Sequence, residues 1–494
     1  MEEKYIASID LGSSKIALTV ARIEGENIQV VYYEESPSEG IRNSYVFNPK
    51  MVEDNLKIAV GKAEAALKIK ILQAVVNMPR YYVREETATA KIERNTDSGY
   101  ISQEEVDNLK GVAVDSYPLD DSQRQTIYGA VAQSFSTEDA MQETEGNIVG
   151  MNSSFLEGNF KAFIGSRRYI ENIDMIFNNL GIALAKKYFV PSILPMAVLK
   201  PDQRENGVAL IDFGAGVTSV TLFADNILRH YSAIPFGGKT ITNDIRTECM
   251  VSVGVAENIK KAFGGCMPDK LQTLADKTLQ IEEEENIKTR IPVKYLSEVI
   301  TARVKEIMDA ILYEIQMSGF ADRLRSGVVL TGGGANLLNC ANYIKELSGY
   351  NVSVGFPRNL FSYDGCPQIK DPSAVTSVAM ILAAKDDDML SCTDKPPVLR
   401  QEETAGTEPA EPEMQPEEER VPDPAQPAEP ERQAAEPVGG LFAPDAFGPR
   451  EERPKQTKRK VSKESKPKPE GSKIGQIIWK KLGNLFEDMK DEEV

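Results

Sequence analysis

Two short hydrophobic runs that each end in an aspartate are the clearest pattern in the chain. Residues 5–9 and 208–211 are apolar apart from one serine, and Asp10 and Asp212 follow them directly. In both places a turn of small residues, a second apolar run, another turn and a third run come next. Continuous apolar runs of this length are typical of buried strands. The pattern therefore predicts the same three-stranded unit twice, once at the N-terminus and once near the middle of the chain.

A third turn, rich in glycine, follows the apolar run 328–330 and precedes a helical pattern. It contains Gly332, Gly333, Gly334 and Asn336. A strand, a glycine turn and a helix start form an anion- or nucleotide-binding geometry. One such motif is a weak signal, and the spacing is neither that of a P-loop nor that of a dinucleotide fold. Three turns of this kind in one chain together favour nucleotide binding over ordinary hairpins.

Apolar residues at a helical period predict the longer helices at 49–67, 167–180 and 294–317, and a last one that begins at Pro372. The hydrophobic pattern changes between residues 84 and 165. There, three alternating strands surround a helix that opens with a Ser-x-x-Glu capping box, Ser102–Glu105. We expect a compact α+β insertion in this region. It carries no catalytic constellation, so a structural or interaction role is favoured.

Composition excludes several classes of protein. The net charge is −18, which argues against nucleic acid as the main partner. The five cysteines are scattered and there is one histidine, so neither a zinc site nor a disulfide framework is expected. No signal peptide is visible at the N-terminus, and no apolar run reaches the roughly 18 residues that a membrane span needs.

The C-terminal hundred residues change character twice. Folding signals stop at 386, and residues 395–454 are rich in Pro, Glu and Ala, so they are predicted to stay disordered. Within them, 439–449 is an apolar island that is either a docking motif or a chance patch. A basic run at 455–468 then precedes the segment 471–494.

That last segment is predicted to form an amphipathic helix. At 100° per residue one face carries Ile474, Ile477, Ile478, Leu482, Leu485, Phe486 and Met489, with Trp479 at its edge. A Trp-bearing amphipathic helix after a polybasic stretch is typical of a membrane-surface anchor that binds anionic lipid. The alternative is a helix docked on the protein's own core. We favour it less, because a long disordered linker separates the helix from that core.

The three turns, in this order, resemble the actin, Hsp70 and sugar-kinase superfamily, in which two similar halves clamp ATP. Within that superfamily the chain resembles FtsA, an actin-like bacterial cell-division family. The insertion lies where FtsA carries its distinctive subdomain, and the segments 235–246, 256–260 and 371–379 look like those of FtsA. The C-terminal amphipathic helix is similar to the membrane-targeting tail of the family.

The resemblance implies an α/β actin-like ATPase fold with two duplicated RNase H-like halves, an α+β insertion subdomain and a disordered C-terminal linker ending in an amphipathic helix. The implied parts are subdomain 1A at 1–83, 166–204 and 359–385, the insertion 1C at 84–165, subdomain 2A at 205–243 and 307–358, subdomain 2B at 244–306, the linker at 386–470 and the helix at 471–494.

The resemblance also implies a site for ATP and Mg²⁺. Asp10 and Asp212 would organise Mg²⁺ through water, and any contribution to catalysis would come from them. The implied phosphate-binding residues are Gly12, Ser13, Ser14, Lys15, Gly214, Gly216 and Thr218. Glu257 and Lys260 would contact the ribose and base, and Gly332, Gly333, Gly334 and Asn336 would face adenosine.

Two departures from the superfamily pattern bear on hydrolysis. In the second hairpin Ala215 and Val217 replace a glycine and a threonine, and Ser219 stands where an aspartate is common. Residues 189–195 offer no carboxylate to orient an attacking water. Losing that group costs catalysis while leaving phosphate binding largely intact. We therefore favour nucleotide as a switch for polymerisation, with slow hydrolysis at most.

By resemblance, the expected function is to anchor the FtsZ ring to the cytoplasmic face of the inner membrane at the division site. The implied partners are the C-terminal peptide of FtsZ, other copies of the chain, anionic lipid and further divisome proteins. A sugar-kinase-like small-molecule kinase and a pilus-assembly actin-like ATPase are the alternatives. An Hsp70-like chaperone would need a β-rich domain after residue 385, where the Pro/Glu-rich linker begins instead.

Overall fold

The computed structural model describes residues 3–94, 99–283 and 287–397, which belong to one compact unit. The apolar island, the basic run and the amphipathic segment predicted near the C-terminus lie outside these residues.

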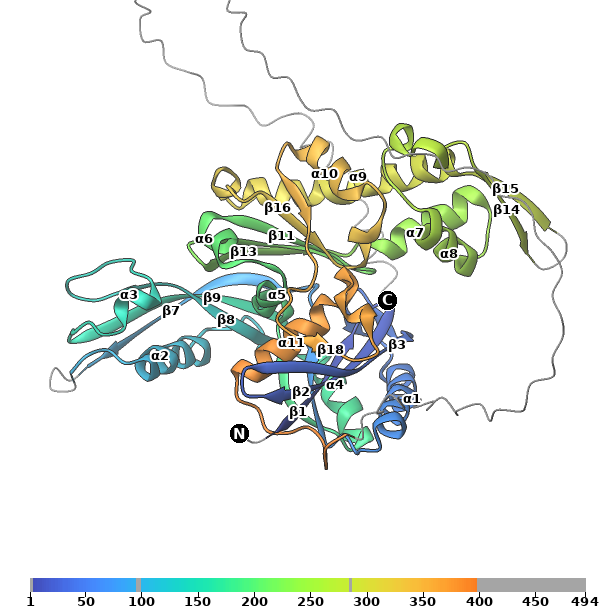
Figure 1. Cartoon of the computed structure of the whole chain (residues 1–494). Helices are drawn as coiled ribbons and strands as arrows, with labels where there is room; N and C mark the ends of the chain where they lie inside the picture. Colours follow the sequence, from blue (N-terminus) through green and yellow to red (C-terminus); the bar gives the residue numbers. More distant parts are fainter. Residues whose placement is uncertain (1–2, 95–98, 284–286, 398–494) are drawn as a thin grey trace, which may run out of the picture. The chain divides into compact units, whose positions relative to one another are not determined.

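The first half is built on a six-stranded sheet (Figure 1). Strands β1, β2 and β3 are antiparallel, whereas β6 and β10 run parallel to β1 on its other side. The strand order is β10-β6-β1-β2-β3-β18. The strands are β1 Lys4–Leu11, β2 Lys15–Glu24, β3 Asn27–Pro37, β6 Gln73–Asn77, β10 Ala183–Tyr188 and β18 Ser362–Tyr363, with the short pair β4 Ile41–Arg42 and β5 Tyr45–Val46 beside them.

The second half repeats this sheet. Its order is β13-β12-β11-β16-β17, again with three antiparallel strands followed by two that run parallel to the central one. Strand β11 therefore corresponds to β1, and β16 corresponds to β6. The strands are β11 Val208–Phe213, β12 Thr218–Ala224, β13 Ile227–Ile234, β16 Val328–Thr331 and β17 Val352–Val354. The duplication that the sequence pattern predicted is confirmed.

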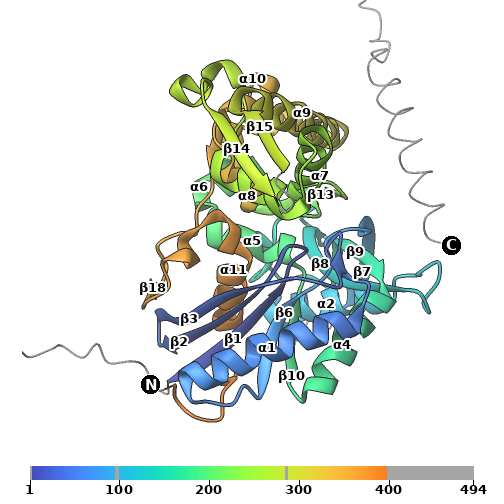
Figure 2. The ribbon, with the colours of Figure 1, turned by 90° about the vertical axis from the view of Figure 1, so that its right-hand side faces the viewer.

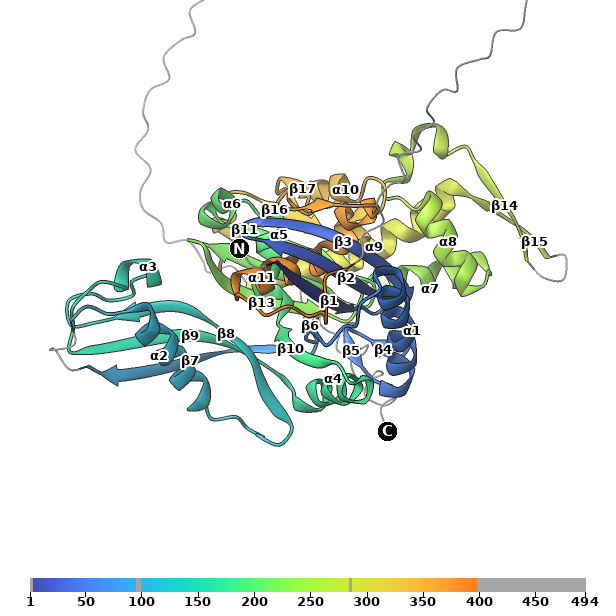
Figure 3. The same ribbon diagram turned by 60° about the horizontal axis from the view of Figure 1, so that its bottom comes forward.

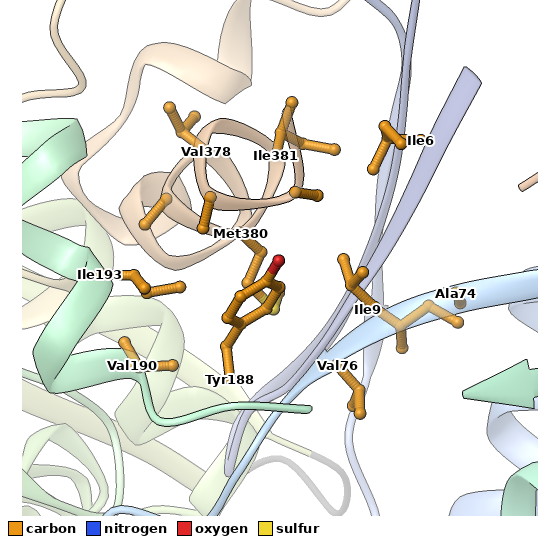
Figure 4. Packing of buried hydrophobic residues seen from close by; sticks show 14 of the residues in the cluster. Ile6, Ile9, Ala74, Val76, Tyr188, Val190, Ile193, Val378, Met380 and Ile381 are labelled. Atoms are coloured by element: carbon orange, nitrogen blue, oxygen red, sulfur yellow. The ribbon is translucent and has the colours of Figure 1, made fainter. Parts of the chain in front are cut away.

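Helix α11 (Val375–Asp386) forms the centre of the main core. Each of its residues from Val375 to Ala384 is buried, which explains why its sequence shows no polar face. It packs on α5 (Val190–Val198) and on β1, and Figure 4 shows Val378, Met380 and Ile381 in this cluster. Helices α1 (Pro49–Leu67) and α4 (Arg167–Leu180) lie on the other face of the sheet (Figure 2).

The second half carries a smaller cluster of elements after β13. It consists of α7 Gly238–Cys249, α8 Val253–Phe263, the hairpin β14 Thr278–Glu283 and β15 Ile287–Pro292, and the long α9 Val293–Met317. Helix α9 buries one face along its length, as its period predicted. The remaining elements are α6 Pro201–Asn206, α10 Cys340–Ser348 and the 3₁₀ turns η2 Pro268–Lys270, η3 Gln272–Leu274, η4 Ala321–Arg323, η5 Gly333–Asn336, η6 Pro367–Lys370 and η7 Pro372–Ala374.

The insertion is a separate α+β layer (Figure 3). A three-stranded sheet, β7 Arg84–Glu93, β9 Phe155–Ser166 and β8 Gln125–Ser136, carries α2 Gln103–Asp115 and the short α3 Glu145–Ile148. The predicted capping box at Ser102 and Glu105 is present. Phe135 and Phe160 pack edge to face at the centre of its own hydrophobic core. Among the described residues, no helix is both long and apolar enough to cross a bilayer.

The predicted start of the linker at 386 is wrong for the residues that follow it directly. Cys392 is fully buried, its N–H donates to the carbonyl of Tyr5 at 2.6 Å, and its own carbonyl accepts from Leu72 at 2.9 Å. The three aspartates 386–388 end the helix but do not end the fold. The chain turns there and returns to the first sheet at the start of β1 and the segment that leads into β6, a contact that no local pattern predicts.

We expect a chain ending at residue 385 to be less stable than one ending at 397. It would lose the main-chain bonds of Cys392 to Tyr5 and Leu72 and that of Asp394 to Lys70. At roughly 1 kcal/mol each, their loss should lower the free energy of unfolding by about 3 kcal/mol. Urea unfolding followed by circular dichroism measures this. Equal stability of the two chains would show that the 387–394 contact contributes nothing.

Candidate functional site

The turns that follow β1 and β11 are built alike. In the first, the N–H of Gly12 donates to the carbonyl of Lys15 at 3.1 Å, and in the second, Gly214 donates to Val217 at 3.0 Å. Asp10 and Asp212 occupy the same register in their hairpins, one position before the last strand residue. Both side chains are buried. Two carboxylates are therefore presented at equivalent strand ends.

The two turns also touch each other. A Cβ on Gly216 would lie 2.7 Å from the hydroxyl oxygen of Ser13, so no larger residue fits there. That hydroxyl is itself fixed, because it accepts from the N–H of Ser44 at 3.0 Å. Ser14 is exposed beside it. The turn that holds Gly12, Ser13 and Ser14 thus meets the turn that holds Gly214 and Gly216.

The glycine turn after β16 lies against the second hairpin. Gly332 has φ +81°, and a Cβ there would come within 2.5 Å of a carboxylate oxygen of Asp212. A Cβ on Gly334 would overlap the ring of Phe213. Gly333 is different: it is exposed, and its Cβ would meet only Ser373, at 3.7 Å. Packing thus requires glycine at 332 and 334, whereas position 333 borders open space.

Glu257 and Lys260 lie one turn apart on α8 and form an ion pair at 2.6 Å. Lys260 also donates to the carbonyl of Gly238 at 2.9 Å, and the N–H of Gly238 donates to Gly214 at 3.0 Å. The pair is therefore linked to the second hairpin through the start of α7.

Burial would raise the pKa of Glu257, but hydrogen bonds from Lys260 and Thr242 outweigh it and lower the pKa.

Lys15 and Asn336 meet the start of the segment that leads into α11. Lys15 pairs with Glu35 and donates to the hydroxyl of Ser373 at 2.9 Å. Asn336 donates to both carboxylate oxygens of Asp371, at 2.9 and 3.1 Å. Asp371 and Ser373 were not predicted as site residues. Their signal in the sequence is the cap at the start of the last helix, which says nothing about the glycine turn.

Thr218 is placed differently from the other predicted site residues. It is fully buried, and its hydroxyl donates to the carbonyl of Phe236 at 2.8 Å. The hydroxyl thus holds β12 to the end of β13 and is occupied within the protein.

Arg80 is the main residue that sequence reasoning missed. Its guanidinium forms an ion pair with Asp212, and its charge also acts on Asp10. Burial raises the pKa of Asp10, and the charges of Arg80 and Lys15 oppose that rise. Three positions before Arg80, the Asn77 side chain accepts from the N–H of Leu11 at 2.7 Å. Asn77 is the last residue of β6 and Arg80 follows that strand at its carboxyl end, where the ends of parallel strands meet. That position is the signal that was available.

These residues fit ATP with Mg²⁺. The turns supply backbone N–H groups and an open glycine position, and Lys15 supplies a positive charge for phosphates. Among the described residues, no group of three or more His, Cys, Asp or Glu side chains is suited to hold a metal by itself. A metal would thus depend on phosphate and water for most of its ligands, as Mg²⁺ commonly does.

Comparisons with known proteins agree with this architecture. A family model described as cell division protein FtsA matches residues 209–379. Proteins of that description from Neisseria meningitidis serogroup B and Borreliella burgdorferi are 24% and 27% identical over 386 and 369 residues, which cover 78% and 73% of this chain and 91% and 86% of theirs. A solved chain from a PilM–PilN type IV pilus biogenesis complex has a TM-score of 0.55 at 12% identity, covering 76% of this chain and 98% of that one.

The duplicated sheets and their paired aspartate hairpins have the actin-like fold, and the predicted fold class is confirmed for the described residues. The resemblance to the FtsA cell-division family is confirmed as well, because the relatives match over most of the chain.

We expect Gly334→Ala and Gly333→Ala to differ sharply in stability. At 334 the added methyl would overlap the Phe213 ring, and overpacking of this kind costs about 1–3 kcal/mol. At 333 the methyl has room, so the free energy of unfolding should change by less than about 1 kcal/mol. Denaturant unfolding of both variants tests the assignment. A Gly333→Ala variant as unstable as Gly334→Ala would contradict the open position at 333.

Proposed function

We propose that this chain binds ATP with Mg²⁺ and acts as an actin-like cell-division protein that assembles in a nucleotide-dependent way. The observation that carries the proposal is the convergence of three separate turns, at Gly12, Gly214 and Gly332, on two buried aspartates. Packing accounts for glycine at 332 and 334 but not at 333, and a ligand that approaches the backbone closely would account for it there.

In this proposal the backbone of the two hairpins holds the β- and γ-phosphates, and Lys15 adds a positive charge. Glu257 and Lys260 face the ribose and base, while the turn at Gly332–Asn336 faces adenosine. Asp10 and Asp212 hold the water shell of Mg²⁺. When bound, the metal neutralises phosphate charge. Thr218 contributes through its backbone, since its hydroxyl is bonded to Phe236.

Hydrolysis is proposed to be slow. Helix α5, which follows β10, begins with Val190 and Pro191, and both are buried. Neither offers a carboxylate or amide to orient a water, and such a group carries much of the rate in nucleotide hydrolases. The nucleotide would then act by holding the halves together, so that its binding favours assembly.

The proposed cellular role is to attach the FtsZ ring to the membrane. Self-association would use the insertion and the parts that flank the cleft, and the C-terminal peptide of FtsZ would dock on the part at 244–306. The support for this role is the match to relatives described as cell division protein FtsA. Other divisome proteins are further proposed partners.

The proposed anchor is the segment 471–494. The preceding basic run would be drawn to anionic lipid at roughly 1 kcal/mol per residue near the surface. A flexible linker of about 75 residues would span on the order of 45–50 Å, enough to separate the folded part from the bilayer. The location would be the cytoplasmic face of the inner membrane at the division site.

The alternatives fit less well. A small-molecule kinase has no use for an anchor at the end of a long linker, and it would need a catalytic carboxylate in the cleft. A pilus-assembly actin-like ATPase shares the fold, as the PilM–PilN structure shows, but that likeness is at 12% identity and concerns the fold alone.

Nucleotide binding is tested by calorimetry with MgATP. We expect a dissociation constant in the micromolar range, about −8 kcal/mol. Gly333→Asp puts a charge at the open position and should weaken binding at least tenfold, about 1.4 kcal/mol, without a comparable loss of stability. Gly333→Ala is the control for the added volume. If the wild-type chain binds no ATP, or if Gly333→Asp binds as tightly as wild type, the site is misassigned.

Membrane attachment is tested by co-sedimentation with anionic liposomes at two salt concentrations. Leu482→Asp puts a charge on the apolar face of the predicted helix and should release the protein, with ATP binding intact. Gln476→Asp places the same charge on the opposite face and should have a much smaller effect. The anchor is refuted if Leu482→Asp still binds fully, or if wild type binds neutral liposomes as well as anionic ones.

A further inference from the structure

Arg80 occupies a position that the proposed function leaves unexplained. It lies on the segment after β6, which corresponds in the duplicated fold to the glycine turn after β16. One guanidinium nitrogen pairs with Asp212, and another would lie 3.6 Å from a Cβ on Gly214. The positive charge therefore sits beside the second hairpin and acts on both aspartates.

The pair is well shielded from solvent. The side chains of Arg80 and Asp212 are 13% and 7% exposed. A buried carboxylate without a partner is strongly disfavoured, so Asp212 needs a nearby cation to stay in its charged form. In the described structure Arg80 supplies that cation.

The guanidinium of Arg80 does not use all of its hydrogen-bond donors in this ion pair. The Nε of Arg80 is buried and has no hydrogen-bond partner in the described part of the chain. Buried donors are normally satisfied, and arginine in a permanent ion pair typically uses its fork of donors fully. A cation that is held but not fully satisfied can be displaced at lower cost than one in a complete network.

The backbone of Arg80 is held by hydrogen bonds, so only its side chain can move when another cation competes for Asp212. The N–H of Arg80 donates to the hydroxyl of Ser44 at 3.2 Å, and its carbonyl accepts from the hydroxyl of Tyr231. Tyr231 in turn packs edge to face on the rings of Phe163 and Phe189, which also contact each other. Competition for Asp212 would therefore turn the guanidinium away while the backbone of Arg80 stays in place.

We propose that Arg80 is a built-in substitute for the metal: it neutralises Asp212 until Mg²⁺ arrives with a nucleotide, and then yields that carboxylate to the metal's water shell. The inference rests on the proposed function, since it assumes that the cleft takes MgATP. Its consequence is that Mg²⁺ alone does not bind. Without phosphates the ion would have to lose water and displace a paired guanidinium for one or two carboxylates.

The experiment is thermal unfolding without nucleotide, in MgCl₂ or in KCl of equal ionic strength. The wild-type melting temperature should be the same in both. Arg80→Met should melt lower in KCl and recover by several degrees in millimolar MgCl₂, because the metal then takes the vacated position. Arg303→Met is the control, since Arg303 pairs with Asp244 and Glu306 between α7 and α9, in a more exposed place, and should show no Mg²⁺ response.

Two further variants sharpen the result. Adding Asp212→Asn to Arg80→Met should abolish the Mg²⁺ response. Arg80→Lys retains a positive charge but lacks the paired donors of the guanidinium group. It should therefore fold and show a smaller Mg²⁺ response than Arg80→Met. This variant keeps the test decisive if Arg80→Met does not fold. A wild-type chain stabilised by Mg²⁺ alone, or Arg80 variants that ignore it, would overturn the proposal.

Calorimetry separates this proposal from the proposed function. If Arg80 competes with Mg²⁺, the Mg²⁺ concentration that half-saturates ATP binding should fall at least tenfold in Arg80→Met. If wild type binds MgATP and Arg80→Met does not, Arg80 is a direct nucleotide contact and the substitution model is wrong. Failure of wild type to bind ATP would instead count against the proposed function, and the Mg²⁺ melting experiment would still decide the role of Arg80.

Discussion

Two buried carboxylates at equivalent strand ends are the constraint on which the site depends. Asp10 and Asp212 end the central strands of two sheets with the same topology, and each is nearly inaccessible to water. Burial raises the pKa of Asp10, which is the expected response of a carboxyl group removed from solvent. A nearby positive charge opposes this rise and favours the carboxylate, and Arg80 supplies such a charge, which acts on Asp10 and pairs with Asp212.

Hydrogen bonds also join the glycine turn after β16 to the segment that leads into the core helix α11. Asp371 accepts from Asn336 in the glycine turn and from the N–H of Ser373 at 2.8 Å, just before α11. Burial would raise the pKa of Asp371, but these hydrogen bonds lower it, so its carboxylate is stabilised in the charged form. Because α11 is buried on all sides, a shift of the turn would have to be accommodated by the central helix of the molecule.

The insertion is tied to the second half through charged and polar contacts. Glu85 on β7 bonds His230 at 2.8 Å and accepts from the N–H of Tyr231 at 2.9 Å. Lys161 on β9 completes the cluster by pairing with Glu85 at 2.8 Å. Strand β13 thus contacts the insertion and also pairs with β12, the second strand of the second hairpin. Sequence reasoning gave the sole histidine no role, because its partners lie more than 140 positions away.

The sequence by itself determined the local parts of this protein. Hydrophobic periods located the three-stranded hairpin units and the longer helices, and the small residues after Asp10 and Asp212 marked the hairpins, because these signals depend on neighbouring positions. Only the tertiary structure decided which distant groups meet. The pairing of Arg80 with Asp212, the bond of Asn336 to Asp371 and the return of Cys392 to the first sheet join residues far apart in the chain. Such contacts follow from strand order and the closure of the two halves, which no local pattern encodes.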